Sequence, residues 1–390
     1  MMLPTPTLEL LVLQPTPLCN LDCTYCYLPN RKSTARMPME VVEAAVRSAV
    51  ESPFLGPQLT IVWHAGEPMV IAPGWYEEAF ARIERIVASR TRVTHSFQTN
   101  GTRLHDGWSG LLARPDVRIG VSYDGPAFLH DAHRVRLDGS GTHASVRQGM
   151  ELLNRAGIPF HVISVVTRAT LAHPESFLDD VISTGAFEIG LNFEEQEGVH
   201  ASSSLGETSV EEEVRRFFAR LLEHARKRSR DAGGAPRIRE VDSLSALLLQ
   251  PRPGGVAARG TQENEGFRIV SVAHDGACST WSPELLEQRG ADGGNFILGN
   301  VLHDSLENLW RGEAFRTRQR EIDRGRDACA RDCAFHEVCG GGSPSNKLSE
   351  LQRLDGTQTS HCRVTRQVLA EVVLSALESD LGLHEGPDRL

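Results

Sequence analysis

The chain has 390 residues, 40% of them hydrophobic, and a formal net charge of -10 at pH 7. This length is enough for one large and one smaller domain around a substantial core. The negative charge leaves no excess of Lys and Arg for a phosphate backbone or an anionic membrane surface, so we expect no nucleic-acid partner and no membrane partner. Residues 1–14 lack a basic segment, and their apolar run is too short for a signal peptide or a membrane span. We therefore predict a cytoplasmic protein, and the sequence makes no prediction of its oligomeric state.

Residues 8–195 alternate short apolar runs with amphipathic stretches. This alternation predicts parallel βαβ units, and six such units make most of a TIM-like barrel, in which chemistry takes place in the loops after the strands. We therefore predict an α/β fold that begins with a partial (β/α)6 TIM-like barrel. Its expected strands lie at 8–14, 59–65, 93–100, 117–124, 160–167 and 188–193, and its expected helices at 39–51, 74–89, 145–157, 174–184 and 210–228.

The pattern changes after the sixth strand. Residues 197–210 are small and polar and predict a loop over the barrel mouth. A short helix is expected near 241–250, a hairpin at 267–281 and a last helix at 364–379. These features predict four parts: the barrel at 1–232, a bridging segment at 233–266, a small second domain at 267–364, and a C-terminal helix and tail at 365–390.

Three of the eight cysteines, Cys19, Cys23 and Cys26, form the pattern C-x3-C-x2-C after the first strand. Three thiolates on a short loop can hold one iron–sulfur cluster and leave its fourth iron without a protein ligand. A structural zinc ion would need a fourth ligand, and three unligated thiols would be open to oxidation. Disulfides are not expected in a reducing compartment. The pattern therefore favours a cluster with one open iron.

The cysteine loop resembles the signature of the radical S-adenosylmethionine (SAM) enzymes, in which an aromatic residue, here Tyr25, precedes the last cysteine. The resemblance implies a 4Fe-4S cluster on Cys19, Cys23 and Cys26, whose open iron binds the amino and carboxylate groups of SAM. It further implies reductive cleavage of SAM to a 5′-deoxyadenosyl radical that abstracts hydrogen from the substrate. A reductant such as flavodoxin or ferredoxin is then expected as a partner.

The ends of the next strands resemble the same family. "AGEP" at 65–68 is similar to its Gly-Gly-Glu-Pro turn, with alanine in place of the first glycine, and "SYDGPAFLHDAHR" at 122–134 is similar to its Ser-x-Asp-Gly-Pro segment. Each residue alone also suits an ordinary structural role, but their joint order behind the cysteines favours cofactor binding. The implied SAM contacts are the main chain of Ala65 and Gly66 and the Glu67 carboxylate at the ammonium group, Gln98, Thr99 and Asn100 facing the cofactor, Ser122 and Asp124 near the ribose, and Arg134 at the carboxylate.

A second cysteine group consists of Cys329, Cys333, Cys339 and Cys362. Four thiolates can close one zinc site or one cluster. The segments around them resemble the SPASM domain of radical SAM peptide and protein maturases, although the first spacer is one residue longer than usual. The resemblance implies a SPASM-like domain with one auxiliary 4Fe-4S cluster on these four cysteines. Cys278 matches the first ligand of a further set that is otherwise missing, and is either a residual ligand or a buried thiol.

"CGGGSPSNKLSE" followed by "TSHC" most resembles the maturases of glycine-rich-repeat peptides. The resemblance implies that the chain abstracts a side-chain hydrogen from a ribosomally made precursor peptide and installs a cyclophane crosslink, with the auxiliary cluster accepting an electron. A catalytic base is also needed, and position suggests Asp275 and Glu194. Both also suit turn or strand-end roles, and His64 is more readily structural.

Three alternatives are kept open. The first is an anaerobic sulfatase-maturing enzyme that forms formylglycine, against which the incomplete inner cysteine set counts. The second is thioether formation, which usually comes with an N-terminal leader-binding domain, and the first strand begins near residue 8. Leader recognition would then fall to the chain's own surface or to a separate protein. The third is a non-catalytic interaction protein that binds zinc through both cysteine groups.

Overall fold

A single curved sheet organises the chain. The computed structural model describes residues 5–206, 210–230, 234–249, 261–290 and 292–383. Its strands pair in the order β10-β9-β8-β1-β2-β3-β4-β5-β6-β7. Neighbours from β8 through β1 to β7 are parallel, whereas β9 and β10 run antiparallel. The bounds are β1 Leu8–Leu13, β2 Leu55–Trp63, β3 Arg92–Thr99, β4 Val117–Ser122, β5 His161–Val166, β6 Glu188–Phe193, β7 Arg237–Ile238, β8 Ile269–Val272, β9 Ala277–Thr280 and β10 Gly299–Asn300.

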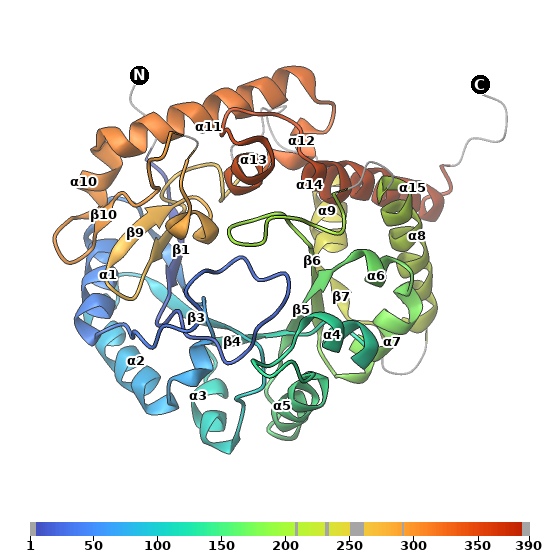
Figure 1. The fold of residues 1–390 in the computed structure, drawn as a ribbon, viewed down its shortest axis with the longest axis horizontal. Helices are drawn as coiled ribbons and strands as arrows, with labels where there is room; N and C mark the ends of the chain where they lie inside the picture. Colours follow the sequence, from blue (N-terminus) through green and yellow to red (C-terminus); the bar gives the residue numbers. More distant parts are fainter. Residues whose placement is uncertain (1–4, 207–209, 231–233, 250–260, 291, 384–390) are drawn as a thin grey trace.

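Helices cover the outside of the arc of strands, as Figure 1 shows. No helix among the described residues combines the length and apolarity needed to span a membrane. The bounds of the α-helices are α1 Met39–Glu51, α2 Pro73–Val87, α3 Ser109–Leu112, α4 Ala127–His133, α5 His143–Arg155, α6 Arg168–Leu171, α7 Pro174–Ser183, α8 Val210–Arg228, α9 Arg239–Leu249, α10 Leu306–Arg311, α11 Glu313–Asp332, α12 His336–Cys339, α13 Pro344–Leu351, α14 Ser360–Cys362 and α15 Leu369–Asp380. A π-helix, Arg363–Val368, joins α14 to α15, and short 3-10 turns lie at Pro68–Val70, Asp106–Trp108 and Pro283–Glu287.

Apolar side chains fix the helices on the sheet. Leu11 and Leu13 of β1 are 0% exposed. Trp63 at the end of β2 meets Tyr76 of α2 edge-on, with 5.2 Å between the ring centroids, and Phe97 of β3 packs on the same tyrosine at 5.0 Å. Burial of such apolar surface is the main force that holds the layers of an α/β domain together.

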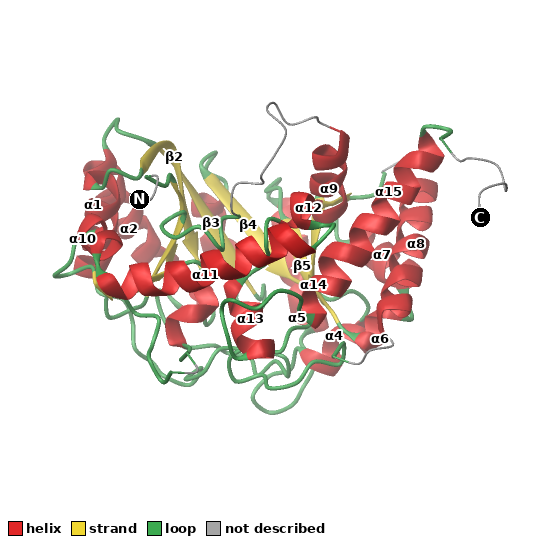
Figure 2. Ribbon diagram, turned by 90° about the horizontal axis from the view of Figure 1, so that it is seen from above, coloured by secondary structure: helices red, strands yellow, loops and turns green. Residues whose placement is uncertain are grey.

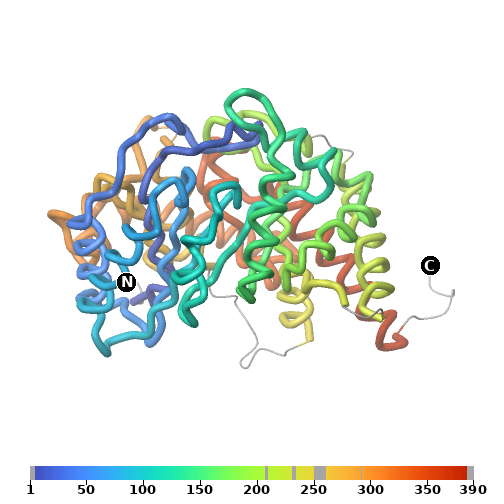
Figure 3. Tube along the Cα trace, turned by 90° about the horizontal axis from the view of Figure 1, so that it is seen from below, coloured from blue at the N-terminus to red at the C-terminus, as the bar shows by residue number. Residues whose placement is uncertain are grey.

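The loops after the strands meet on one side of the sheet. Figure 1 shows the segment between β1 and α1 crossing the space inside the arc, and Figure 3 shows it beside the segment after β4. The Asp22 N–H donates to the Val135 carbonyl at 2.8 Å, and the Val199 N–H to the Tyr27 carbonyl at 3.1 Å. Loops from three strands are therefore joined there, on the side where Figure 2 draws most of the green segments.

The α/β class and the mostly parallel sheet agree with the sequence. All six predicted strands are present as β1 to β6, and the expected hairpin forms β8 and β9. This hairpin does not begin a separate sheet, because Leu10 to Leu13 of β1 pair in parallel with Ile269 to Val272 of β8. The long helix α11 and the short helices α10, α12 and α13 were not predicted. Parts of the expected loop at 197–210, of the bridging segment, of the helix at 241–250 and of the C-terminal tail lie outside the described residues.

Candidate active site

The first cysteine group lies in the loop between β1 and α1. Cys19, Cys23 and Cys26 are partly exposed and form no disulfide. The Cys19 N–H donates to the Arg31 carbonyl at 2.9 Å, and the Cys26 N–H to the Cys23 carbonyl at 3.2 Å. Burial raises the pKa of Cys19 to about 12 and that of Cys23 to about 11, and the charge of Cys26 acts on both in the same direction. The sulfur atoms therefore share one small region.

These three thiols fit an iron–sulfur cluster. Thiolates in such surroundings need a cationic group to stabilise their charge, and bound metal provides it. Among the described residues, no three His, Cys, Asp or Glu side chains stand close enough together to share a single metal ion. A four-iron cluster does not require that convergence, because each cysteine ligates a different iron.

Hydrogen bonds between polar side chains connect the cysteine loop to the segment after β3. Asn100 Nδ2 donates to Asn20 Oδ1 at 3.0 Å and lies 4.0 Å from the Cys19 sulfur. Asn20 Nδ2 donates to Thr102 Oγ1 at 2.8 Å, while the Thr102 N–H and hydroxyl donate to Asn100 Oδ1 at 3.0 and 2.7 Å. Asn100 was predicted to face the cofactor. Asn20 and Thr102 were missed, since neither polar residue carries a signal of its own in the sequence.

Glu67 anchors the turn after β2. Its Oε1 accepts from the Met69 N–H at 2.9 Å and the Thr99 hydroxyl at 2.6 Å, and its Oε2 accepts from the Asn100 N–H at 2.6 Å. The side chain is 1% exposed, and burial raises its pKa. Both oxygens thus hold the ends of β2 and β3 together, and the contact between Glu67 and the SAM ammonium stays a prediction.

The same turn passes close to the cysteine loop. Gly66 has φ +56°, and a Cβ there would lie 2.5 Å from the Leu18 carbonyl oxygen and 2.6 Å from that of Thr16. Only glycine fits this approach. Ala65 also has a positive φ, 73°, which an L-residue adopts at a cost. The alanine that departs from the Gly-Gly-Glu-Pro pattern therefore occupies a position where glycine would be unstrained.

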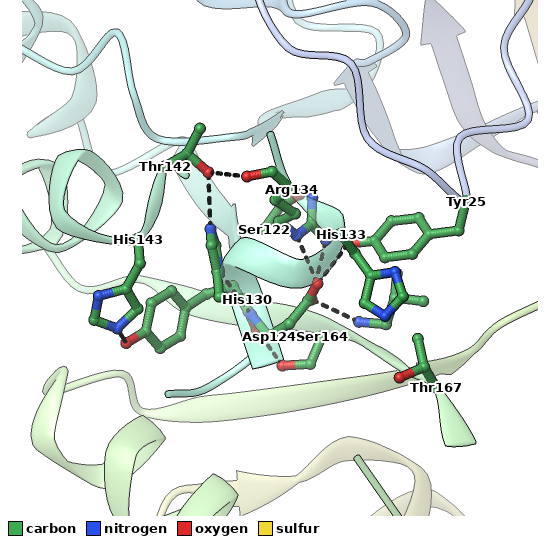
Figure 4. Close-up of polar contacts among 12 residues, drawn as sticks. Tyr25, Ser122, Asp124, His130, His133, Arg134, Thr142, His143, Ser164 and Thr167 are labelled. Carbon is green, nitrogen blue, oxygen red and sulfur yellow. Dashed lines mark hydrogen bonds and ion pairs between the residues drawn. The ribbon is translucent and has the colours of Figure 1, made fainter. Parts of the chain in front are cut away.

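Asp124, after β4, is the centre of a buried polar cluster (Figure 4). Arg134 Nε donates to its Oδ2 at 2.9 Å and Arg134 Nη2 to its Oδ1 at 3.2 Å. The Val165 N–H donates to Oδ1 at 2.9 Å, and the Tyr25 hydroxyl donates to Oδ2. Arg134 also lies over the Tyr25 ring, 5.4 Å from its centroid. The pair thereby holds the aromatic residue of the cysteine loop, while its predicted contacts with SAM stay predictions.

His130 and Thr142 support the main chain at Asp124 through hydrogen bonds. The Asp124 N–H donates to His130 Nδ1 at 3.2 Å, and His130 Nε2 bonds Thr142 Oγ1 at 3.0 Å (Figure 4). Burial lowers the pKa of His130 to about 4, so the ring is neutral at pH 7. The sequence pattern assigned His130 no role, although it lies within the quoted segment 122–134. Nearby, Gln98 Nε2 donates to Ser122 Oγ at 3.0 Å, so these two predicted contacts face each other.

The two predicted bases have local partners. Glu194, after β6, bonds His200 Nε2 at 3.1 Å and accepts from the Ser204 N–H at 3.0 Å, which fixes the loop that follows. Asp275 is exposed in the turn between β8 and β9, where it accepts from the Ala277 N–H at 3.1 Å. The structure does not bring the two together, and a role as base stays a prediction for both.

The second cysteine group comes from the ends of three helices: Cys329 and Cys333 at the end of α11, Cys339 at the end of α12 and Cys362 at the end of α14. Burial raises the pKa of Cys362 to about 11, and the charges of Cys339, Cys333 and Cys329 act in the same direction. All four thiols are therefore close in space. Lys347 is 4% exposed and its Nζ lies 4.0 Å from the Cys329 sulfur. This lysine was missed by the sequence pattern. Cys278, in contrast, is 1% exposed on β9, where it pairs with Gly299.

Comparisons with known proteins extend over most of the chain. Residues 13–181 match the family model described as the radical SAM superfamily. An uncharacterised protein of Synechocystis sp., sll1766, is 36% identical over 379 residues, which cover 96% of this chain and 93% of that protein. The serine-type anaerobic sulfatase-maturating enzyme of Klebsiella aerogenes is 31% identical over 172 residues, which cover 44% of this chain and 42% of the enzyme.

Solved structures share the fold. Native anSMEcpe with bound AdoMet and Cp18Cys peptide superposes with a TM-score of 0.76 at 20% identity, over 97% of this chain and 99% of that one. Streptococcus suis SuiB bound to precursor peptide SuiA superposes with a TM-score of 0.65 at 14% identity, over 91% and 76% of the two chains. The family model that matches residues 13–181 contains the cysteine loop and the strand-end residues around it. Through these residues the chain belongs to the radical SAM superfamily.

Proposed function

We propose that the chain matures a ribosomally made precursor peptide by installing an oxidative crosslink of the cyclophane type. The observation that carries the proposal is the pairing of an open three-cysteine loop with a separate group of four cysteines. When bound, SAM and its 4Fe-4S cluster supply a 5′-deoxyadenosyl radical that takes a hydrogen atom from the peptide. The likeness to SuiB, which is bound to its precursor peptide, supports a peptide substrate.

The residues of this chain position that chemistry. Glu67, Asn100 and Asp124 each connect the cysteine loop, or the turn beside it, to a neighbouring strand end. A loop fixed at several points keeps reacting atoms in place and lowers the entropic part of the barrier. Main-chain groups at Ala65 and Gly66, together with Ser122 and Arg134, are the further groups that we assign to SAM.

A crosslink removes two hydrogens from the peptide, and the radical takes only one of them. The other must leave as a proton and an electron. Glu194 and Asp275 are the carboxylates that we propose for the proton. Cys329, Cys333, Cys339 and Cys362 would hold, in a SPASM-like domain, the auxiliary cluster to which the electron passes. Flavodoxin or ferredoxin is the proposed reductant.

Formylglycine formation is the second candidate. It is favoured by the 31% identity to the Klebsiella aerogenes sulfatase-maturating enzyme, although that match covers less than half of either chain. Both candidates use the same radical and differ in the product. One joins two side chains of a peptide, whereas the other converts a Ser or Cys of a sulfatase to an aldehyde.

Anaerobic reconstitution tests the shared chemistry. We expect about eight irons per chain and SAM cleavage to 5′-deoxyadenosine under dithionite. Cys19→Ala should abolish cleavage, and Thr317→Ala, an exposed change on α11 far from the cysteine loop in sequence, should leave it intact. Two tightly bound zinc ions without iron would favour the non-catalytic interaction protein instead.

The product separates the two candidates. The chain is co-expressed with the small open reading frame next to its gene, and separately incubated with a sulfatase-derived Ser peptide. A crosslink and an oxidised serine both lose two hydrogens, so mass alone does not distinguish them. Only the aldehyde reacts with a hydrazide probe. Hydrazide-negative product of reduced mass, with fragmentation blocked between the joined residues, supports the crosslink, and hydrazide-positive product contradicts it.

A further inference from the structure

A cavity opens beside the cysteine loop. Its volume is about 410 Å³, which lies in the range of ligand-binding clefts. Five separate segments contribute to its wall: Gln14 after β1, the residues directly after Cys26, the loop after β6, the 3-10 turn after β9, and the end of α13. The residues that matter here are Tyr27, Glu197, Glu284 and Glu287.

The cavity adjoins the candidate active site through direct main-chain contacts. The Val199 N–H donates to the Tyr27 carbonyl at 3.1 Å. Gly198 has φ +54°, and a Cβ there would lie 2.3 Å from the same carbonyl oxygen. The loop that carries Glu197 thus packs directly against Tyr27, and the glycine at position 198 allows this close approach.

Glu197 is buried in the cavity wall without a complete set of partners. Its side chain belongs to a residue that is 7% exposed, and its Oε1 has no hydrogen-bond partner. A buried carboxylate oxygen left unpaired is unfavourable by several times the value of an ordinary hydrogen bond. Such a group in a native protein calls for an explanation, and a bound ion or ligand group is one that can supply the missing partner.

Acidic side chains predominate among the ionisable groups around the cavity. Within the described residues, no Lys, Arg or His forms an ion pair with Glu197, Glu284 or Glu287. The two basic side chains that line the cavity are engaged elsewhere: His200 bonds Glu194, and Arg289 donates to the Gly293 carbonyl. Burial and then the neighbouring carboxylates raise the pKa of Glu197, as expected where acidic groups surround it.

We propose that this cavity receives a cationic side chain, Lys or Arg, of the peptide substrate, with Glu197 as its principal partner and Glu284 beside it. The inference rests on the proposed peptide substrate and adds a specificity determinant to it. A guanidinium or ammonium group would complete Glu197 Oε1 with a charge-assisted hydrogen bond. It would also anchor the peptide next to the cysteine loop.

Binding of matched peptides to the reconstituted chain with SAM tests this. The probes are Ac-Gly-Gly-Arg-Gly-Gly-NH2 and the same peptide with citrulline, a neutral isostere of arginine, titrated by calorimetry under anaerobic conditions. We expect the arginine peptide to bind about tenfold more tightly. Glu197→Gln and Glu284→Gln should each reduce that preference to threefold or less. Glu77→Gln, an equal charge change on the exposed face of α2, should preserve it.

Several outcomes overturn the proposal. These are equal affinity for the two peptides, no binding of either at millimolar concentration, and a preference that survives in both cavity variants. A loss of SAM affinity in Glu197→Gln but not in Glu77→Gln would assign the cavity to SAM, and displacement of the arginine peptide by micromolar Mn²⁺ would assign it to a metal ion. Near-UV circular dichroism confirms that each variant is folded. Because the readout is binding, a chain that prefers arginine but modifies no peptide would refute only the proposed function.

Discussion

Arg134 and Asp124 form a two-point ion pair that is almost completely buried, with 2.9 Å between Nε and Oδ2 and side chains 8% and 3% exposed. The pair lies under Tyr25, whose hydroxyl donates to the same carboxylate. Burial alone would raise the pKa of Asp124, but the charge of Arg134 and the hydrogen bonds from Arg134 and Tyr25 outweigh it and hold the pKa below its usual value. The carboxylate is therefore charged at neutral pH and depends on Arg134.

Removal of Arg134 should strongly destabilise the chain. Arg134→Met keeps most of the side-chain volume but leaves Asp124 as an uncompensated buried charge, so we expect the free energy of unfolding to fall by about 3–5 kcal/mol. Equilibrium urea unfolding measures it. The matched control is Arg220→Met, which breaks an exposed pair with Glu175, 49% and 40% exposed. That change should lower the free energy by about 1 kcal/mol or less, and equal losses in the two variants would contradict the argument.

A buried imidazole away from the site should make stability depend on pH. His95 stacks on Phe80 and accepts from Trp63 Nε1, and burial lowers its pKa from 6.5 to about 3. Below pH 6.5 the unfolded chain binds a proton at this residue while the folded chain does not, so the free energy of unfolding falls as the pH drops from 6.5 towards 3.

His95→Gln isolates this contribution. The glutamine carbonyl can still accept from Trp63, but it does not titrate. We expect a smaller loss of unfolding free energy between pH 7 and pH 5 in this variant than in the natural chain, measured by urea unfolding at both values. An unchanged difference would show that His95 titrates normally.

Removal of the methyl group of Ala65 and addition of one at Gly66 should change the free energy of unfolding in opposite directions. Ala65→Gly relieves a positive φ and should stabilise the chain by up to about 1 kcal/mol. Gly66→Ala places a Cβ against the Thr16 and Leu18 carbonyls and should destabilise it by about 2 kcal/mol or more, with loss of iron after reconstitution. Gly74→Ala, where nothing lies within 4 Å, is the control. Destabilisation by Ala65→Gly would contradict the assignment of strain.

The iron content of cysteine variants tests the second cysteine group. Cys333→Ala should lower the iron from about eight to about four per chain, because it removes one of four ligands. Cys278→Ala should leave the iron unchanged if Cys278 is a buried thiol, as its 1% exposure suggests. Iron lost from Cys278→Ala would instead support a residual ligand, and about twelve irons in the natural chain would refute the single auxiliary cluster.

The sequence predicted the strands well because their apolar runs are local signals. Contacts between segments that are distant in the sequence were harder to predict. Asp124 and Arg134 were each assigned to the cofactor, and they also bond to each other, because helix α4 between them brings Arg134 back to Asp124. The sequence predicted that Glu197 belongs to a polar surface loop. In the structure, Gly198 lets this loop pack against Tyr27, and the Glu197 carboxylate is buried. Such contacts depend on tertiary packing, which residue type and spacing do not encode.

The pairing of β8 with β1 has a consequence for the cysteine loop. Gln14, five residues before Cys19, donates its N–H to the Val272 carbonyl at the end of β8, and the chain reaches Cys278 on the next strand. The start of the cysteine loop and the hairpin that carries Cys278 are thus joined within one hydrogen-bonded sheet. A change that weakens the β1–β8 pairing would therefore disturb both of them together.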